Sequence, residues 1–410
     1  MEVFSPSLER VNELIALKEQ KDQGIYSGIP LWESFPRLGE IIPTIDKGQV
    51  IINVAASGVG KSMITRYKDI VVPWLFVRKH PELQIDLQFV VFLLEDDVRR
   101  FKDYILSTVL YLEYGVYINP KMLRSSFKTS LSDDTIGKLK SIIPIVDELL
   151  HRCIIEESLY NSYGIYKKCR MLSEQWGTHY YTDMLKEGKI ITRVEYNKLP
   201  KLGRERFKET SVEELRNEGI NPTDYYEYFK YSHYTPSNPK QHVIAVFDNI
   251  NCLVPDEHEG GLKDAMDNFM YNYLRKNLAK HWNWSCVAVQ QNVGGAEEQA
   301  FNYKGENIVE KLLPNLSMLG DSKLTQRAAH LIYALFDPFR YGVQEFMGYN
   351  IARLKDNVRF LFILKNNDGK SNKVIPLYFA GENSYFKELP DPTQMTEDIY
   401  KKIETKQVKP

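Results

Sequence analysis

Short apolar runs alternate along the chain with longer stretches of helical periodicity. The runs span residues 50–54, 89–94, 243–247, 286–289, 331–335, 360–364 and 374–379. Runs of about five apolar, often β-branched residues are typical of strands that are buried on both faces. Most of the intervening stretches are long enough for crossover helices, so the pattern predicts an α/β fold with a mainly parallel central sheet. The last runs are joined by short turns, which predicts antiparallel strands at one edge of that sheet.

Helical periodicity predicts helices over residues 7–23, 61–75, 161–176 and 261–282. The first of these is amphipathic but too small to be a domain. We therefore predict three parts: an N-terminal helical segment at residues 1–27, one α/β domain at 28–390, and a C-terminal tail at 391–410.

Residues 178–241 break the rhythm of strands and helices. This segment is polar, rich in tyrosine and punctuated by Pro200, Pro222, Pro236 and Pro239, which predicts an insertion into the α/β domain. A small solvated subdomain is one interpretation of it. A surface for docking a partner or stacking bases is the other.

Composition narrows the class of protein. The 410 residues are 43% hydrophobic and 26% charged, which predicts a globular chain. A net charge of −1 gives no bulk attraction for nucleic acid, so any DNA contact is expected to be local. No apolar run of about 18 residues and no signal-peptide pattern occurs, so we expect a protein of the cytoplasm that does not contact the membrane. The four cysteines lack metal-binding spacing and are expected to be free thiols.

The strongest chemical signal follows the apolar run 50–54. It consists of Ala55, Ala56, Ser57, Gly58, Val59, Gly60, Lys61 and Ser62. Small residues let the backbone curl so that its N–H groups and the start of the next helix face phosphate oxygens. In such a P-loop, Lys61 reaches the β- and γ-phosphates of ATP and the Ser62 hydroxyl binds Mg²⁺.

Three polar residues follow other apolar runs, where open α/β sheets bind ligands. Asp248 fits the Walker B acid that holds Mg²⁺, with a turn or helix-cap aspartate as the alternative. Glu95 fits the base that orients the attacking water, with a structural carboxylate as the alternative. Gln291 fits a sensor of the γ-phosphate and would otherwise be an ordinary polar residue after a strand. The Gly-containing stretch that follows it, residues 294–307, is predicted to be a mobile loop.

The order and spacing of these segments resemble the RecA-like C-terminal domain of the DnaB family of replicative helicases, from Gly28 onward. The resembling segments are Gly28-Ile29-Pro30-Leu31-Trp32, the P-loop with its initial Ala55, Phe92-Leu93-Leu94-Glu95, Phe247-Asp248-Asn249-Ile250, Val289-Gln290-Gln291, residues 314–326 and Lys365-Asn366-Asn367-Asp368-Gly369. The resemblance implies a RecA-like fold that uses ATP and Mg²⁺ in a hexameric ring on single-stranded DNA, with a loader or primase as candidate partners. It also implies a DNA-facing loop within residues 314–326 and the cytoplasm of a bacterium or phage-infected host as the location.

Three features depart from the family pattern. We expect no counterpart of the family's helical N-terminal domain among these residues, and residues 7–23 resemble only its linker helix, which docks on an adjacent subunit. The in-trans arginine position falls on Asn367, although its companion Lys365 remains, so Arg327 and Arg340 become candidates for the finger. The insertion at residues 178–241 is the third departure.

Three functions remain open from the sequence. The first is an ATP-dependent replicative helicase that translocates on single-stranded DNA. The second is a RecA- or RadA-like recombination or regulatory ATPase that binds DNA without unwinding it, because fold does not fix function. The third is a loading or structural protein that binds nucleotide and hydrolyses it weakly, for which Asn367 is the main support.

Overall fold

The computed structural model describes residues 6–125, 130–182, 190–192, 217, 230–292, 312–319, 323–408 and 410. The chain divides into two compact units. The main unit comprises residues 1–166 and 242–410, and the second unit comprises residues 167–241.

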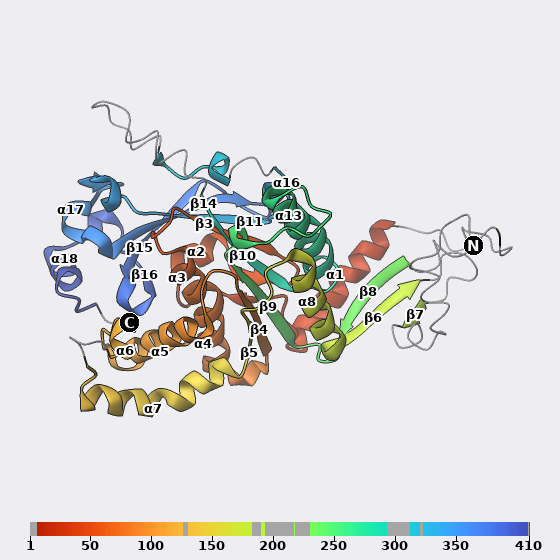
Figure 1. The fold of residues 1–410 in the computed structure, drawn as a ribbon, viewed down its shortest axis with the longest axis horizontal. Coiled ribbons are helices and arrows are strands. Elements are labelled where there is room, and N and C mark those ends of the chain that lie inside the picture. The colour runs from red at the N-terminus through yellow and green to blue at the C-terminus, as the bar shows by residue number, and fades with distance from the viewer. Residues whose placement is uncertain are drawn as a thin grey trace. The chain divides into compact units, whose positions relative to one another are not determined.

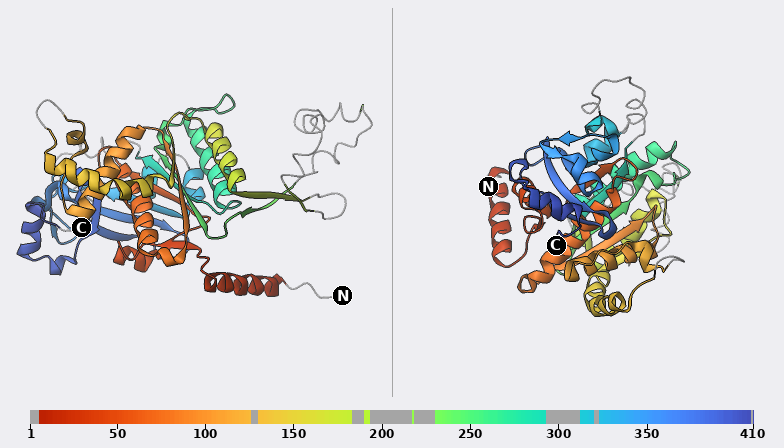
Figure 2. Two further views of the ribbon diagram at one scale, coloured as in Figure 1. Left: turned by 90° about the horizontal axis from the view of Figure 1, so that it is seen from below. Right: turned by 90° about the vertical axis from the view of Figure 1, so that its left-hand side faces the viewer.

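A nine-stranded sheet forms the centre of the main unit, in the order β16-β15-β14-β11-β3-β10-β9-β4-β5 (Figure 1). Its strands are β3 (Val50–Ala55), β4 (Asp86–Leu93), β5 (Cys153–Glu156), β9 (Gln241–Asp248), β10 (Ser285–Gln291), β11 (Leu331–Phe336), β14 (Val358–Asn366), β15 (Lys373–Ala380) and β16 (Tyr385–Glu388). Strand β3 pairs in parallel with β10 and β11, β10 pairs in parallel with β9, and β4 pairs in parallel with β5. Strands β11, β14, β15 and β16 pair antiparallel at the other edge, drawn in blue in Figure 2. The α/β fold with antiparallel C-terminal edge strands is confirmed.

The central strands are buried on both faces, as their unbroken apolar runs predict. Every residue of β3, β9 and β11 is buried. Helices α3 (Lys61–Thr65) and α4 (Val72–Lys79), joined by the π-helical segment η1 (Arg66–Val71), lie on one side of the strands. Helix α13 (Leu262–Asn268), its π-helical continuation η4 (Phe269–Ala279) and α16 (Lys323–Ala328) lie on the other side (Figure 1).

A buried polar network joins η1 to β3 directly behind the P-loop. The amide of Asn53 donates to Thr65 Oγ1 at 2.9 Å and to Asp69 Oδ2 at 2.6 Å. Lys68 pairs with Asp69, and both side chains are fully buried. The Lys68 ammonium also lies 4.3 Å from the centroid of the Tyr333 ring. Because unpaired buried charges are costly, this network fixes the helix after the P-loop against the sheet.

The remaining helices of the main unit cover the β4–β5 end and the C-terminal edge (Figure 1). They are α5 (Val98–Tyr114), α6 (Pro120–Leu123), α7 (Asp133–Leu150), α17 (Ile351–Leu354) and α18 (Glu397–Glu404). Helix α8 (Ser162–Trp176) begins in the main unit and continues into the second unit. Short 3₁₀ segments are η2 (Pro81–Leu83), η3 (Ile250–Cys252), η5 (Leu316–Leu319), η6 (Phe339–Tyr341), η7 (Lys355–Asn357), η8 (Gly381–Asn383) and η9 (Pro392–Gln394). A short hairpin joins β12 (Glu345–Phe346) to β13 (Tyr349–Asn350).

The N-terminal helix α1 (Pro6–Asp22) forms as its periodicity predicts. Its apolar side chains at Leu8, Val11, Leu14 and Ile15 are each about half exposed. The chain then forms β1 (Gly28–Pro30), α2 (Pro36–Ile41) and β2 (Thr44–Asp46), in which β1 and β2 pair antiparallel. Within the part of the chain that is described, no helix combines the length and apolar character needed to cross a bilayer.

The second unit contains a three-stranded antiparallel sheet. Strand β6 (Gly177–Thr182) pairs on one side with β7 (Ile190–Thr192) and on the other with β8 (Lys230–Pro236). Much of the predicted insertion at 178–241 lies outside the described residues, as does the predicted loop at 294–307. The predicted domain boundaries remain predictions.

Candidate functional site

The P-loop leaves β3 at Ala55 and enters α3 at Lys61. Gly58 and Gly60 adopt left-handed φ angles of 77° and 111°, which favour glycine because a side chain there is strained. The first N–H groups of α3 have no acceptor within the helix, so the loop presents them to any ligand in front of it.

Lys61 lies where three strand ends converge. Its side chain is 8% exposed, and its ammonium lies 3.5 Å from Gln291 Oε1 and 3.7 Å from Glu95 Oε2. The structure therefore brings together the three residues predicted as catalytic. The residues come from the P-loop, the end of β10 and the turn after β4, which meet because parallel strands end at the same sheet edge.

The two predicted metal ligands are in direct contact. The Ser62 hydroxyl donates to Asp248 Oδ1 at 3.0 Å, and Asp248 is buried at the end of β9. Burial raises the pKa of Asp248 to about 6, against the opposing effects of Arg66, the Ser62 hydrogen bond and Lys61. Arg66 is itself paired with Asp96 at 3.2 Å. Burial thus disfavours the ionised form of Asp248, and a bound cation would offset that cost.

Asn249 and Asn251 position the predicted catalytic residues, although the sequence patterns assigned a role to neither. The Asn249 amide donates to Glu95 Oε2 at 3.1 Å, after a cis Asp248–Asn249 peptide bond. Asn251 Oδ1 accepts from the backbone N–H of Gln291 at 2.8 Å. Their place directly after the predicted Walker B acid was the available signal.

Arg359 supports the P-loop from β14 and was also missed. This buried guanidinium donates through Nε to the carbonyl of Val59 at 2.8 Å and pairs with Asp337 at 3.3 Å and Asp356 at 2.7 Å. It also lies 4.5 Å from the centroid of the Phe379 ring. The sequence signal for Arg359 was a single charged residue at the start of an apolar strand run.

The four residues predicted to act in trans fall in two places. Arg340 donates to the carbonyl of Ser57, in the P-loop of its own chain. The other three residues, Lys365, Asn367 and Arg327, lie at the opposite end of the strands from the P-loop, where β11 begins and β14 ends.

At that end of the strands Lys365 donates to the carbonyls of Gln326 and Ala329, at 2.8 and 2.6 Å. Burial, with a contribution from Arg275, lowers the pKa of Lys365. Asn367 and Arg327 are exposed. The in-trans roles remain predictions.

The strand, glycine-containing loop and helix, with acids and an amide at neighbouring strand ends, define the RecA-like class of P-loop fold. The fold is similar to that of a solved ATPase domain, with a TM-score of 0.59 at 14% identity over 94% of this chain and 100% of that chain.

A second similar structure is "The Structure Of A DnaB-Like Replicative Helicase And Its Interactions With Primase". Its TM-score is 0.57 at 15% identity, over 94% of this chain and 72% of that chain. The resemblance to the DnaB family is thereby confirmed at the level of the fold. No protein-family model matches the sequence, and no curated protein matches it.

Proposed function

We propose that this chain is an ATP- and Mg²⁺-dependent replicative DNA helicase motor. The observation that carries the proposal is the position of the Lys61 ammonium, within 3.7 Å of both Glu95 and Gln291 and beside the Ser62–Asp248 pair. A lysine, a metal-binding pair, a water-orienting carboxylate and a sensing amide are the parts that P-loop hydrolysis requires.

The site fits a nucleotide triphosphate with its metal. Lys61 and the open N–H groups of the loop neutralise and bind the β- and γ-phosphates. Ser62 and Asp248 would hold Mg²⁺ through their side-chain oxygens, and the metal would neutralise charge on the phosphates. The described residues contain no group of three or more His, Cys, Asp or Glu side chains placed to hold a metal. A metal held jointly with the substrate agrees with that finding.

The same geometry supports the following proposed steps of hydrolysis. Glu95, fixed by Asn249, orients the attacking water and accepts its proton. Gln291 contacts Lys61 through its side chain and Asn251 through its backbone, so loss of the γ-phosphate is relayed to the end of β10. In the motor that we propose, this change moves loops that grip single-stranded DNA.

A homo-oligomeric ring, hexameric in the form we favour, provides the proposed setting. The half-exposed apolar side chains of α1 support a role for this helix in docking on an adjacent copy. Lys365, Asn367 and Arg327 gather at the end of the strands opposite the P-loop, which supports their use toward a neighbour's nucleotide. The DnaB-like structure with a similar fold interacts with a primase, and we propose a primase or loader as a partner in the cytoplasm of a bacterium or phage-infected host.

Two alternatives keep the fold and change the function. A RecA- or RadA-like ATPase would bind DNA without unwinding it. A loading protein would bind nucleotide and hydrolyse it weakly, and the neutral Asn367 favours this alternative because an amide cannot neutralise transition-state charge.

A forked DNA carrying a fluorophore and quencher separates the three functions. We expect the full chain with ATP and Mg²⁺ to displace one strand, and Lys61→Ala to abolish displacement together with tight ATP binding. Lys79→Ala removes an exposed lysine at the far end of the helical stretch that follows the P-loop, and this variant should displace the strand normally.

Hydrolysis stimulated by single-stranded DNA without displacement would favour the RecA-like alternative. Tight ATP binding with negligible turnover would favour the loading protein. Unchanged ATP affinity in Lys61→Ala would refute the P-loop assignment.

A further inference from the structure

A cavity of about 660 Å³ opens at the end of the central strands that lies opposite the P-loop. We name it the basic pocket, and its lining residues are Gly48, Tyr271, Arg275, Lys276, Lys280, Arg327 and His330. Gly48 precedes β3 and His330 precedes β11, whereas the P-loop follows the far end of β3. The pocket is therefore separate from the candidate nucleotide site.

Four arginine and lysine side chains line the basic pocket without an acid among its lining residues. Across the described part of the chain, none of Arg275, Lys276, Lys280 and Arg327 forms an ion pair. Asp368 acts on Arg275 only at longer range. Like charges gathered in this way repel one another, and a bound anion relieves the repulsion.

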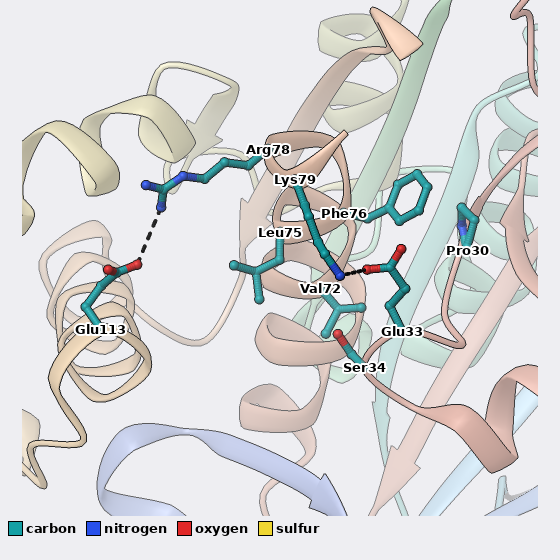
Figure 3. Close-up of a pocket in the computed structure, with 9 residues that line it drawn as sticks. All are labelled: Pro30, Glu33, Ser34, Val72, Leu75, Phe76, Arg78, Lys79 and Glu113. Carbon is teal, nitrogen blue, oxygen red and sulfur yellow. Dashed lines mark hydrogen bonds and ion pairs between the residues drawn. The ribbon is translucent and has the colours of Figure 1, made fainter. Parts of the chain in front are cut away.

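The cavity in Figure 3 shows the opposite arrangement. It has a volume of about 420 Å³ and also holds two cations, Arg78 and Lys79. There Arg78 pairs with Glu113 at 3.7 Å, and Lys79 pairs with Glu33 at 2.6 Å (Figure 3). That cavity is neutralised by its own acids, so its cations provide a matched control for those of the basic pocket.

His330 contacts Arg275 and does not add charge. Its Nδ1 accepts from the backbone N–H of Val50 at 2.8 Å, and Nη1 of Arg275 lies 2.6 Å from the same nitrogen. Burial, together with Arg275, lowers the pKa of His330 to about 4. The imidazole is therefore neutral near pH 7 and adds no positive charge to the pocket.

Tyr271 adds an aromatic face to the basic pocket. Its side chain is 37% exposed, and the ammonium of Lys276 lies 4.7 Å from its ring centroid. Aromatic rings beside cations are the surface on which nucleobases stack while their phosphates are neutralised.

We propose that the basic pocket binds phosphate groups, carried either by a single-stranded nucleic acid or by a free nucleotide. Arg275 and Arg327 supply planar guanidinium groups suited to phosphate oxygens, and Lys276 and Lys280 supply point charges. The proposal stands whether or not the chain unwinds DNA, because these groups lie away from the chain's own P-loop, although Arg327 is also a candidate for the in-trans role.

The test compares the full chain with two double variants of equal charge change. Lys276→Gln with Lys280→Gln alters the basic pocket, and Arg78→Gln with Lys79→Gln alters the cavity of Figure 3. Circular dichroism first confirms that each variant is folded. Binding of a labelled oligothymidylate is then measured from about 50 to about 300 mM salt, the range over which phosphate contacts weaken strongly, and calorimetry counts the ATP sites per chain.

If a strand is the ligand, the slope of log affinity against log salt falls by about 1.4, since each phosphate neutralised on a single strand contributes about 0.7. If a free nucleotide is the ligand, the basic-pocket variant has one ATP site fewer than the unaltered chain. That loss of one site is counted whether or not the P-loop binds ATP. Unchanged slope and unchanged site number, or equal effects of the two double variants, would overturn the proposal.

Discussion

Glu95 depends on a neighbour for its orientation. Half of its side chain is exposed, and the hydrogen bond from Asn249 and the ion pair with Lys61 hold it. An exposed carboxylate without such contacts samples several rotamers and loses the alignment that proton transfer from water requires.

We therefore expect substitution of Glu95 to lower turnover strongly and substitution of Asn249 to lower it less. Glu95→Gln should keep ATP affinity and lower turnover by about 10²- to 10⁴-fold, because an amide cannot accept the proton. Asn249→Ala should keep the carboxylate and lower kcat by a smaller factor, with little change in KM. Single-turnover hydrolysis with parallel nucleotide titrations measures both. Normal turnover in Glu95→Gln would transfer the role to another acid.

Asp248 should make metal-dependent binding sensitive to pH. Its pKa is raised to about 6 by burial, and only the ionised carboxylate binds Mg²⁺. The gain in nucleotide affinity on adding Mg²⁺ should therefore be about tenfold smaller at about pH 5 than at about pH 8. Asp248→Asn, titrated in parallel, corrects for protonation of the nucleotide and should show a flatter profile.

The raised pKa of Asp248 has the opposite effect on the stability of the ligand-free chain, which should fall as pH rises. A carboxyl whose pKa is raised on folding stabilises the folded state below its unfolded value of 3.8, and that contribution is lost as pH rises through about 6. Denaturation of the ligand-free chain between about pH 4 and pH 7 should show this loss, and Asp248→Asn should reduce it. A stability that rises through this window equally in both proteins would contradict the assigned shift.

At the scale of elements, the apolar runs predicted the strands that carry the site. The runs at 50–54, 243–247 and 286–289 correspond to β3, β9 and β10. Strand β3 leads into the loop before Lys61, and β9 and β10 end at Asp248 and Gln291. Strands β1 and β2 were missed because three residues are too few for a periodic signal. The π-helical segments η1 and η4 were missed because apolar spacing does not distinguish them from an α-helix.

Long-range polar contacts explain the rest of what the sequence did not reveal. Arg359 lies 300 positions from Val59, and no local pattern indicates that its guanidinium reaches the P-loop. Likewise Arg275, Lys276 and Lys280 of the basic pocket lie close together in the sequence, whereas Arg327 is far away, and no local pattern joins them. The spacing of apolar residues predicts which helix faces are buried and where strands end. The partners of single charged residues depend instead on how the folded sheet brings distant segments together.

Arg359 links the P-loop to the antiparallel edge, and its loss should affect both stability and ligand binding. Arg359→Met removes the partner of the Val59 carbonyl and of the buried Asp337, so unfolding free energy should fall by about 3 kcal/mol. ATP affinity should fall as well. Denaturant titration and nucleotide titration measure the two effects.

Arg353→Met is the control, because its pairs with Glu397 and Glu404 involve exposed carboxylates. Solvent screens such pairs, so this substitution should leave stability and ATP affinity nearly unchanged. Equal effects of the two substitutions would show that Arg359 does not support the loop.

At the scale of the whole molecule, Asn367 tests whether the site is completed by a second copy. If the turn after β14 reaches a neighbour's nucleotide, Asn367→Arg should raise turnover, since an arginine finger is worth about 10³- to 10⁵-fold where its geometry is right. Turnover per chain should also rise with protein concentration. Ser371→Arg adds the same charge in the same turn and should change little.

Other turnover results would assign the arginine finger to a different residue or exclude a finger acting in trans. Lower turnover in Asn367→Arg, with a large loss in Arg327→Ala, would place it at Arg327. A loss in Arg340→Ala that does not depend on concentration would assign that residue to its own chain's P-loop. Turnover that responds to none of these and is independent of concentration would argue against a ring.

Strand β14 runs from Arg359 at the P-loop to Lys365 at the far end of the sheet, a distance of roughly 20 Å along the strand. A strand that is hydrogen-bonded on both sides keeps its register with its neighbours. A displacement of the P-loop carbonyl that pulls on Arg359 would therefore move β14 together with β11 and β15, toward or away from the opposite end of the sheet. Strand β14 thus connects the P-loop, where we propose that nucleotide is hydrolysed, to the surface that we propose meets another molecule.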